Sequence, residues 1–245
     1  FQSYSFTARN PGGHSSRPRP DNAIYELAGA LKRLESYRFA PMLNETTRAY
    51  FQFRQKHEAG PLGDAMRRWL ADEKDGAAAD YIEADPLEVA MTRTRCVATR
   101  LDGGHADNAL PQMAHALVNC RIFPGVAAKD VQAELQVVAG PQVQVDPFGV
   151  SDPSPPSPLR ADVMKAYTES VRKRHSGAEI VPRMSTGATD GLFFRATGMP
   201  VYGVSGAWII VPEDERAHGR DERIPVKSFF EDLDHWHDMV KALAG

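Results

Sequence analysis

Four prolines within eight residues divide this 245-residue chain into two parts. Residues 151–158 read SDPSPPSP, and prolines at this density favour a stiff extended segment over a helix or a central strand. We therefore place a domain boundary here, with residues 1–150 in one domain and residues 151–245 in the other. The length suits one large domain or two small ones.

The first part alternates between strand-like and helix-like hydrophobic patterns. In residues 2–9, Tyr4, Phe6 and Ala8 alternate with small polar residues, which predicts a half-buried strand. Similar patterns predict strands at residues 92–101, 114–123 and 142–148. Helices are expected after Asp21 as N-cap, near Pro61, after Asp85-Pro86 and over 129–138, with residues 40–60 irregular. The resulting order, β-α-(helical insert)-β-β-α-β, is the ferredoxin-like pattern.

The helix after Asp21 has an apolar stripe that we expect to face the sheet: Ile24, Leu27, Ala28, Leu31 and Leu34.

The second part predicts an α/β arrangement with too few strands. Helices are expected at residues 159–174, through Phe193 and Phe194, and at 226–243, and strands at 179–183 and 200–204. Strands alternating with helices imply a parallel sheet covered on both faces. Two strands are too few for such a sheet, so we expect the others N-terminal to Phe1, in a longer protein. The last helix should bury a stripe at helical spacing: Phe229, Leu233, Trp236, Val240 and Leu243.

Composition argues against two classes of partner. The formal net charge is -3, whereas a nucleic-acid-binding domain normally carries a basic patch or stripe. The longest apolar run, residues 201–211, is interrupted by glycine and serine and is shorter than the roughly 20 residues of a membrane-spanning helix. We therefore expect neither a nucleic acid nor a membrane as partner.

The two cysteines, Cys96 and Cys120, stand in no CxxC or Cys/His metal pattern. Two free thiols in strands is the favoured interpretation, and a disulfide stays open.

His218 is a candidate metal ligand, because it stands beside glycine in a polar loop that follows a predicted strand. One histidine is a weak signal, since catalytic zinc needs three protein ligands, and an exposed loop residue is the simpler interpretation. His235 and His237 are two positions apart and do not share a helix face, so we interpret both as surface residues.

Other polar residues could bind a substrate. His14 follows Gly12 and Gly13, which allow a tight exposed turn from which its ring could donate to an oxyanion. Asn108 and Arg121 flank the loop between two strands, and the Arg121 guanidinium could hold a carboxylate or pair with a surface acid. Residues 185–190, STGATD, could hold an anion at a helix start, or Thr189 or Asp190 could simply cap that helix.

A serine hydrolase is the competing enzyme class. Gly203, Ser205 and Gly206 come close to a nucleophile elbow, but the pattern requires glycine at position 207, where alanine stands. The serine-hydrolase hypothesis therefore fails on this segment.

Four segments occur in order: GGHSSRPRPDNAIYELAGAL (12–31), GGHADNALPQMAHALVNCRIFPG (103–125), STGATDGLFFRATGMPVYGVSG (185–206) and AHGRDERIPVKSF (217–229). Together they resemble the M20 family of zinc metallopeptidases and aminoacylases, which includes carboxypeptidases, N-acyl-amino-acid deacylases and succinyl-diaminopimelate desuccinylases. The resemblance implies an α/β protein. By the same resemblance, a ferredoxin-like lid domain that mediates dimerisation would be joined to the C-terminal part of a parallel-sheet catalytic domain.

The resemblance also implies roles for individual residues. His218 would be the last ligand of a two-zinc site, in which Co²⁺ or Mn²⁺ could replace zinc. His14 would be the lid histidine that stabilises the oxyanion in the partner subunit's active site, and Asn108 would touch substrate. The substrate carboxylate would be held by Arg121, Gly187 and Thr186.

The sequence departs from the family pattern in its metal site. The N-terminal His-x-Asp, the bridging Asp and the Glu-Glu pair of the family have no counterpart here. We therefore expect part of a dimeric zinc amidohydrolase that cleaves a small peptide or N-acyl amino acid next to a free carboxylate, inactive as this piece alone. The alternative is a truncated dimerisation or binding module without activity.

Overall fold

The computed structural model describes residues 1–85, 87–89, 91–149, 154–211, 213–214 and 216–245. Their contacts form two compact units, which we treat separately. Unit 1 comprises Phe1–Pro156 and Arg183–Met199, and unit 2 comprises Ser157–Pro182 and Pro200–Gly245. The boundary that we placed between residues 150 and 151 lies outside the described residues and stays a prediction.

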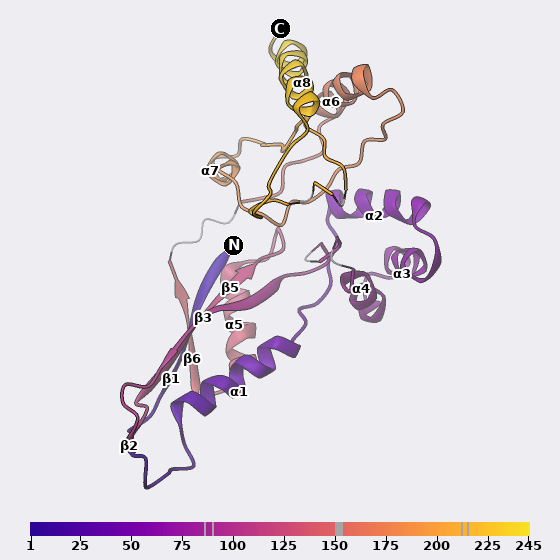
Figure 1. Ribbon diagram of the computed structural model, residues 1–245. Coiled ribbons are helices and arrows are strands. Elements are labelled where there is room, and N and C mark those ends of the chain that lie inside the picture. The colour runs from indigo at the N-terminus through magenta and orange to yellow at the C-terminus, as the bar shows by residue number, and fades with distance from the viewer. Residues whose placement is uncertain (86, 90, 150–153, 212, 215) are drawn as a thin grey trace. The chain divides into compact units, whose positions relative to one another are not determined.

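Unit 1 contains a four-stranded antiparallel sheet with two helices on one face, which we call the lid (Figure 1). Its elements are β1 (Gln2–Arg9), α1 (Ala23–Ser36), β3 (Arg95–Gly103), β5 (Met113–Arg121), α5 (Ala128–Ala139) and β6 (Val143–Phe148). The sheet order is β3-β5-β1-β6. The N-terminal strand β1 lies inside the sheet, and β6 forms one edge. The predicted ferredoxin-like order is confirmed, as is the α/β class.

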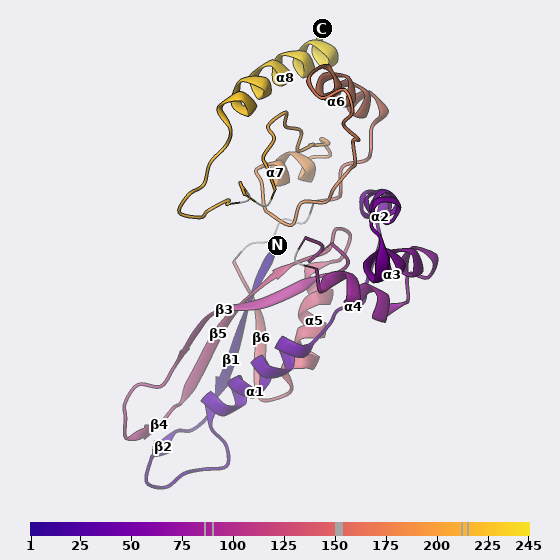
Figure 2. The ribbon, with the colours of Figure 1, turned by 45° about the vertical axis from the view of Figure 1, so that its right-hand side comes forward.

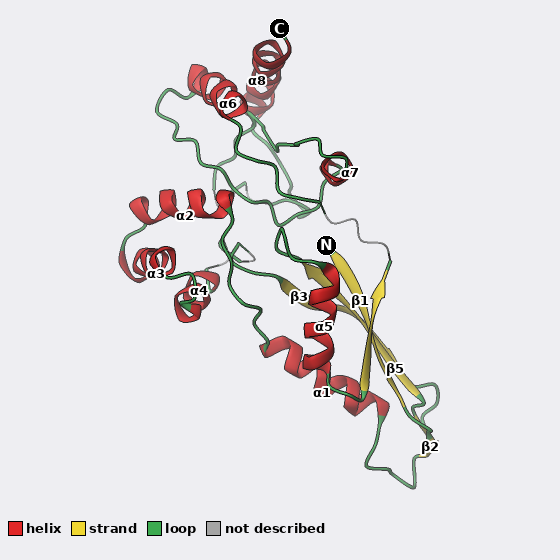
Figure 3. Cartoon of the chain, turned by 180° about the vertical axis from the view of Figure 1, so that it is seen from behind, coloured by secondary structure: helices red, strands yellow, loops and turns green. Residues whose placement is uncertain are grey.

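The core of the lid lies between the sheet and the helices α1 and α5 (Figure 3). Tyr4, Phe6 and Ala8 of β1 are buried as the alternation predicted, and Val118 of β5 lies beside them in the register. The opposite face of the sheet carries hydroxyl and amide side chains, among which Asn119 donates to Ser3. The two-residue period of the sequence thus gave the correct face for the central strands.

The start of α1 differs from the prediction in its capping residue. The side chain of Asn22 accepts hydrogen bonds from the backbone N–H groups of Ile24 and Tyr25, whereas Asp21 pairs with Arg19. Ala30 is buried and Ile24 is two-fifths exposed, so the buried stripe is rotated from the expected one. Asparagine and aspartate cap equally well, and the competing ion pair decides between the neighbours.

Three helices form an insert between α1 and β3: α2 (Glu45–His57), α3 (Gly60–Ala71) and α4 (Gly76–Glu83) (Figure 2). The expectation that residues 40–60 are irregular is wrong, because Asn44 and Thr47 exchange hydrogen bonds in a capping box that starts α2. The helix near Pro61 is confirmed as α3. The expected helix after Asp85 is also wrong. Helix α4 ends at Glu83, and the Asp85 carboxylate then accepts a hydrogen bond from the Leu87 N–H in a turn. Pro86 lies outside the described residues.

Cys96 and Cys120 form a disulfide between β3 and β5, so the interpretation as free thiols is wrong. The register pairs the two residues directly across neighbouring strands, with their Cα atoms 4.0 Å apart. A sequence separation of 24 gave no indication of this pairing, because only the strand register brings the residues together.

Unit 2 is built on a pair of helices, α6 (Ala161–Arg174) and α8 (Val226–Ala244), as predicted. The short helix α7 (Gly191–Ala196) is also confirmed, within the segment assigned to unit 1. No strand occurs among the described residues at 179–183 or 200–204, contrary to expectation. The backbone groups of a strand bond a neighbouring strand. At Val201 a side chain takes that place, because the Ser157 hydroxyl accepts from its N–H and donates to its C=O.

The expected buried face of α8 is also wrong. His235 and Met239 are buried, whereas the whole predicted stripe, Phe229, Leu233, Trp236, Val240 and Leu243, is more than two-fifths exposed. Gly206 lies so close to His235 that a Cβ added to this glycine would stand 2.4 Å from the histidine Cβ. No helix among the described residues is long and apolar enough to cross a membrane.

Candidate functional site

His14 lies at one end of the lid, at the tip formed by two short strands (Figure 2). These strands, β2 (Gly13–His14) and β4 (Ala109–Leu110), pair antiparallel, with His14 opposite Ala109. Gly12 and Gly13 both have positive φ, 74° and 151°, which residues with a Cβ rarely adopt. The glycines therefore allow the turn that presents the exposed His14 ring, as the sequence predicted.

The tip also brings Asn108 next to His14. The N–H of Ser15 donates to the backbone carbonyl of Asn108 at 2.9 Å, which extends the β2–β4 pairing by one bond. Two of the residues singled out in the sequence therefore lie on paired segments at the same exposed tip, although 94 positions separate them along the chain.

Contacts from Ser16 determine which ring nitrogen of neutral His14 carries the proton. The backbone N–H of Ser16 donates to His14 Nδ1 at 3.2 Å, and the Ser16 hydroxyl lies 2.8 Å from the same nitrogen. Because a backbone N–H only donates, Nδ1 is an acceptor, and the proton of the neutral imidazole is on Nε2. The exposed neutral ring thus carries its hydrogen-bond donor on Nε2, which is the form that an oxyanion needs.

Arg121 lies at the opposite end of the lid from His14. It ends β5, eight residues beyond Met113, a span of roughly 26 Å in a strand. Its guanidinium is 5.4 Å from the ring centroid of Phe1, and Arg95 stands opposite it in the register. Within one chain, Arg121 therefore does not share a site with His14.

Thr186 and Gly187 lie on an exposed turn that precedes α7. The N–H of Gly187 donates to the Ser185 hydroxyl at 3.2 Å. Asp190 is the N-cap residue of α7 and makes no side-chain capping bond, so capping by Asp190 does not explain this segment. An exposed turn of this kind can present hydroxyl and N–H groups to an anion.

His218 lies in unit 2 on an exposed loop with an unusual backbone conformation. Its φ is 61°, in the left-handed region that residues other than glycine seldom occupy. The His218 N–H donates to the Glu222 carboxylate at 3.1 Å, and Arg216 pairs with Asp221 on the same loop. These bonds hold the strained residue with its ring exposed.

The described residues do not by themselves make a metal site. Within them, no group of three or more His, Cys, Asp or Glu side chains is close enough to hold an ion. His218 could supply one ligand, whereas catalytic zinc requires three.

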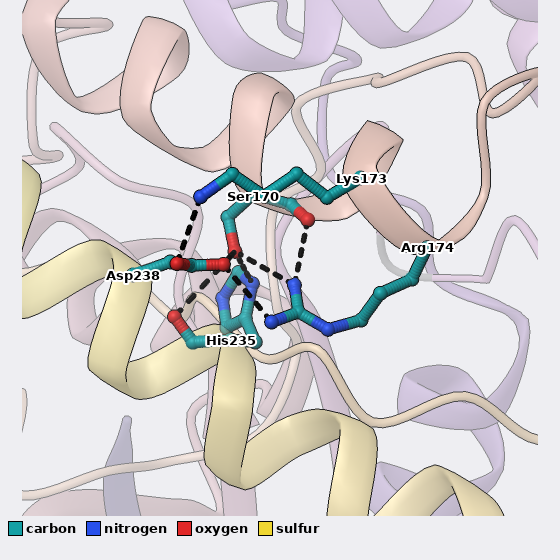
Figure 4. A network of polar contacts seen from close by, with 5 residues as sticks. All are labelled: Ser170, Lys173, Arg174, His235 and Asp238. Carbon is teal, nitrogen blue, oxygen red and sulfur yellow. Dashed lines mark hydrogen bonds and ion pairs between the residues drawn. The ribbon is translucent and has the colours of Figure 1, made fainter.

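A polar network joins α6 to α8 in unit 2 (Figure 4). The Ser170 hydroxyl lies 2.9 Å from His235 Nδ1 and 3.4 Å from Asp238, and the Asp238 carboxylate pairs with Lys173 and Arg174. Bonds from Lys173 and Arg174 lower the pKa of Asp238 to about 2, and burial lowers the pKa of His235. The interpretation of His235 as a surface residue is therefore wrong.

This network is not a catalytic triad, although it contains Ser, His and Asp. In a triad the aspartate bonds the histidine nitrogen that faces away from the serine. Here Asp238 bonds the serine and two cations instead, and His235 Nε2 has no hydrogen-bond partner in the described residues. The arrangement holds two helices together.

The fold and the tip define a class of protein: an α/β chain whose ferredoxin-like lid presents a histidine on a glycine turn. Residues 1–144 match the family model of the M20 peptidase dimerisation domain. The chain therefore belongs to the M20 peptidase family.

Among curated proteins, the chain is 24% identical to a probable carboxypeptidase S-like 2 of Dictyostelium discoideum, over 94% of this chain and 44% of that protein. It is 28% identical to the human N-fatty-acyl-amino acid synthase/hydrolase PM20D1, over 89% of this chain and 44% of that protein. The chain thus spans less than half the length of these relatives.

Among solved structures, an M20 family metallo-carboxypeptidase from Sulfolobus solfataricus has the same fold, with a TM-score of 0.60 and 18% identity. The match covers 98% of this chain and 57% of that one. Human carnosine dipeptidase 1 has a TM-score of 0.57 and 11% identity, covering 99% of this chain and 54% of that one.

Sequence reasoning missed Ser16, which orients the His14 ring. Its place two residues after a histidine in a glycine turn was a usable signal, since serine side chains and N–H groups bond local partners in such turns. It also missed Arg183, whose side chain donates to the Leu87 carbonyl and lies over the Tyr50 ring, and for these contacts the sequence held no signal.

Proposed function

We propose that this chain is part of a dimeric zinc-dependent amidohydrolase, which cleaves a peptide or N-acyl amide bond next to a free carboxylate. The observation that carries the proposal is the exposed His14 ring, which follows a glycine turn and accepts the Ser16 N–H at Nδ1, so that its donor is Nε2. Membership of the M20 peptidase family supports a hydrolase of this type. The names of the relatives, which include carboxypeptidases and an N-fatty-acyl-amino acid hydrolase, support the substrate class.

The residues of this chain would bind and polarise the substrate. The Nε2–H of His14 would donate to the oxygen of the amide carbonyl as negative charge develops there, with Asn108 beside it. Arg121, Thr186 and Gly187 would hold the substrate carboxylate through charge-assisted hydrogen bonds. Because Arg121 and His14 lie at opposite ends of one lid, the proposal assigns them to different active sites of a dimer.

The metal would be shared with residues outside these 245. His218 would supply one ligand from its strained, exposed loop, and the remaining ligands and the general base would come from elsewhere in the protein. Zinc in such a site supplies Lewis-acid polarisation of the carbonyl and an activated water. Co²⁺ or Mn²⁺ is the alternative ion.

The proposed homodimer would form at the β3 edge of the lid. A groove of about 600 Å³ runs along α1 and the end of β3, and its lining includes Leu27, Leu31 and Leu101. The outer edge of β3 pairs with no strand in the described part of the chain, so its backbone groups can bond another strand. A second copy turned by a two-fold axis would present the same edge and groove, which is the commonest form of dimer.

Mixing two inactive variants of the full-length protein tests the enzyme, the dimer and the role of His14 together. His14→Ala leaves the metal ligands intact, and His218→Ala leaves the lid tip intact. If His14 acts in the partner's site, each mixed dimer has one complete site, and an equal mixture recovers about a quarter of the wild-type rate.

Each result of this mixing has a defined meaning. The measurement is zinc-dependent hydrolysis of N-acyl amino acids and dipeptides, with each variant alone as control. Failure of the mixture to recover any rate would contradict action across the dimer. Absence of hydrolysis by the full-length wild type would favour the alternative, a dimerisation or binding module without activity.

A further inference from the structure

The helical insert of unit 1 has a core of its own, apart from that of the lid. Phe51, Met66 and Trp69 are fully buried, and none of them belongs to the cluster between the lid sheet and α1 and α5. The ferredoxin-like pattern requires no helices at this point of the chain. The insert is therefore an additional part, and its contacts with the rest of unit 1 indicate what it does.

A buried carboxylate organises one side of the insert. Glu88 is fully buried, and its Oε1 accepts hydrogen bonds from the Tyr50 hydroxyl at 3.1 Å and from Arg54 Nε at 3.0 Å. Tyr50 is itself buried, so the bond to Glu88 fixes its ring in one orientation. The result is a rigid aromatic platform next to the turn at residues 87–89.

Arg183 binds to this platform from a distant part of the chain. Its Nη2 donates to the backbone carbonyl of Leu87 at 3.0 Å, and its guanidinium carbon is 5.9 Å from the Tyr50 ring centroid. The next residue also contacts the insert, since Asn44 Nδ2 lies 3.9 Å from Met184 Sδ. These contacts attach residues 183 and 184 to the insert, and the exposed turn at 185–187 follows at once.

We propose that Arg183 is a positioning residue, through which the helical insert fixes the turn of Thr186 and Gly187 for binding the substrate carboxylate. This inference rests on the function proposed above. It assigns the insert a role in substrate affinity, and Tyr50 the role of the platform for Arg183.

The physical reason is the cost of ordering a loop. An exposed turn loses conformational entropy when it binds an anion, and each residue that must be fixed adds to this cost. Arg183 fixes the backbone two residues before Ser185, whose hydroxyl accepts from the Gly187 N–H. Part of the ordering is therefore complete before substrate arrives, which raises affinity without changing the chemical step.

Limited proteolysis of the full-length protein tests the attachment without any activity measurement. Trypsin cleaves after Arg183 only when this side chain leaves Tyr50 and Leu87. Tyr50→Leu removes the aromatic face, and we expect cleavage at this bond to become several-fold faster, relative to cleavage after Arg195 in α7. Tyr50→Phe keeps the aromatic face but loses the hydroxyl bond to Glu88, so we expect a smaller increase than in Tyr50→Leu.

Cleavage at two other sites, and the comparison of all three proteins, decide what the proteolysis result means. Unchanged cleavage after Arg67 and Arg68 in α3 shows that the insert of Tyr50→Leu remains folded. Equal cleavage after Arg183 in the wild type and in both variants would overturn the attachment.

Steady-state kinetics of the full-length enzyme tests the positioning role. Arg183→Gln should raise KM for an N-acyl amino acid about tenfold, the effect of one lost hydrogen bond from a charged group, and leave kcat within about twofold. Arg183→Lys keeps a cation over Tyr50 and should restore part of the affinity. Arg195→Gln is the control, because Arg195 in the same segment bonds Ser154 instead of the insert.

The two experiments separate failure of this inference from failure of the proposed function. A wild type that hydrolyses no substrate contradicts the function, and proteolysis still decides whether Arg183 is attached. An active enzyme whose KM is unchanged in Arg183→Gln contradicts the positioning role, as does a fall in kcat alone.

Discussion

The lid and the α6–α8 pair bury their apolar residues to very different extents. In the lid, Tyr4, Phe6 and Val118 are at most 1% exposed, and two helices cover the sheet face that carries them. In α8, Leu233 is 54% exposed and Val240 61%, although the helix is amphipathic. The lid therefore has a complete core of its own, and α8 does not.

Polar contacts join α6 to α8, beside the buried side chains of Val163, Ala166 and Met239. His235 and Ser170 bond each other where the helices meet, and Asp238 pairs with two cations of α6. Hydrogen bonds and ion pairs are directional and contribute about 1 kcal/mol each, whereas a large buried apolar side chain contributes about 2–3 kcal/mol. The comparison teaches that the lid has a large apolar core, whereas the α6–α8 pair has a small one in which polar contacts take a larger share, so the two parts should respond differently to mutation.

The largest expected effect is in the lid core. Phe6→Ala should lower the free energy of unfolding of the lid by about 3–5 kcal/mol, because it removes a fully buried ring and leaves a cavity. Leu233→Ala in α8 should change stability by less than about 0.5 kcal/mol, because that side chain is exposed. Denaturant titration of both variants makes the comparison. A similar loss in both would show that another element covers α8.

Loss of the disulfide should come next. Without the Cys96–Cys120 bond, the lid should lose roughly 3 kcal/mol, since the closed loop spans 24 residues. Thermal unfolding with and without a reductant measures this, and the Cys96→Ala/Cys120→Ala variant should show no response to reductant. A wild type that is equally stable in reductant would argue against this contribution. The α6–α8 pair carries no disulfide and should not respond.

A smaller loss is expected when the ion pairs of unit 2 are broken. Asp238→Asn leaves Lys173 and Arg174 without their carboxylate and should cost about 1 kcal/mol in the stability of the α6–α8 pair, because solvent screens these partly exposed charges. Asp234→Asn, on the exposed side of the same helix, is the matched control and should be nearly neutral. Hydrogen exchange of α6 and α8 amides reports both. Equal protection in the two variants would show that the network does not stabilise the α6–α8 pair.

The smallest effect is a pH dependence confined to unit 2. Burial, with a contribution from Arg174, lowers the pKa of His235, while Asp232 and Asp238 act in the opposite direction. Because the folded pKa lies below the unfolded value of about 6.5, stability is complete above pH 6.5 and falls as the pH drops from there towards the folded pKa. Exchange of α8 amides between pH 7 and 5 measures this fall, and His235→Gln should flatten it. A flat wild-type profile would contradict the prediction.

Much of the candidate site could be predicted because its signals are local. The glycines before His14 and the polar turn at 185–187 are readable from consecutive residues, and His14 and this turn are exposed in the structure. The orientation of the His14 ring and the attachment of Arg183 to Tyr50 could not be predicted. The first depends on which nitrogen the Ser16 N–H meets, and the second joins residues 133 positions apart.

The sequence by itself determined the type and order of most elements. Alternation at residues 2–9 and the helical period at 226–243 are properties of neighbouring residues, and both elements form where they were predicted.

Tertiary structure decided which residues meet. The strand register placed Cys96 opposite Cys120, the capping box of Asn44 and Thr47 started α2, and Ser170 of α6 drew His235 inward while Leu233 stayed exposed. The physical reason is that periodicity fixes the shape of an element, but the face it buries depends on the neighbours that pack and bond against it.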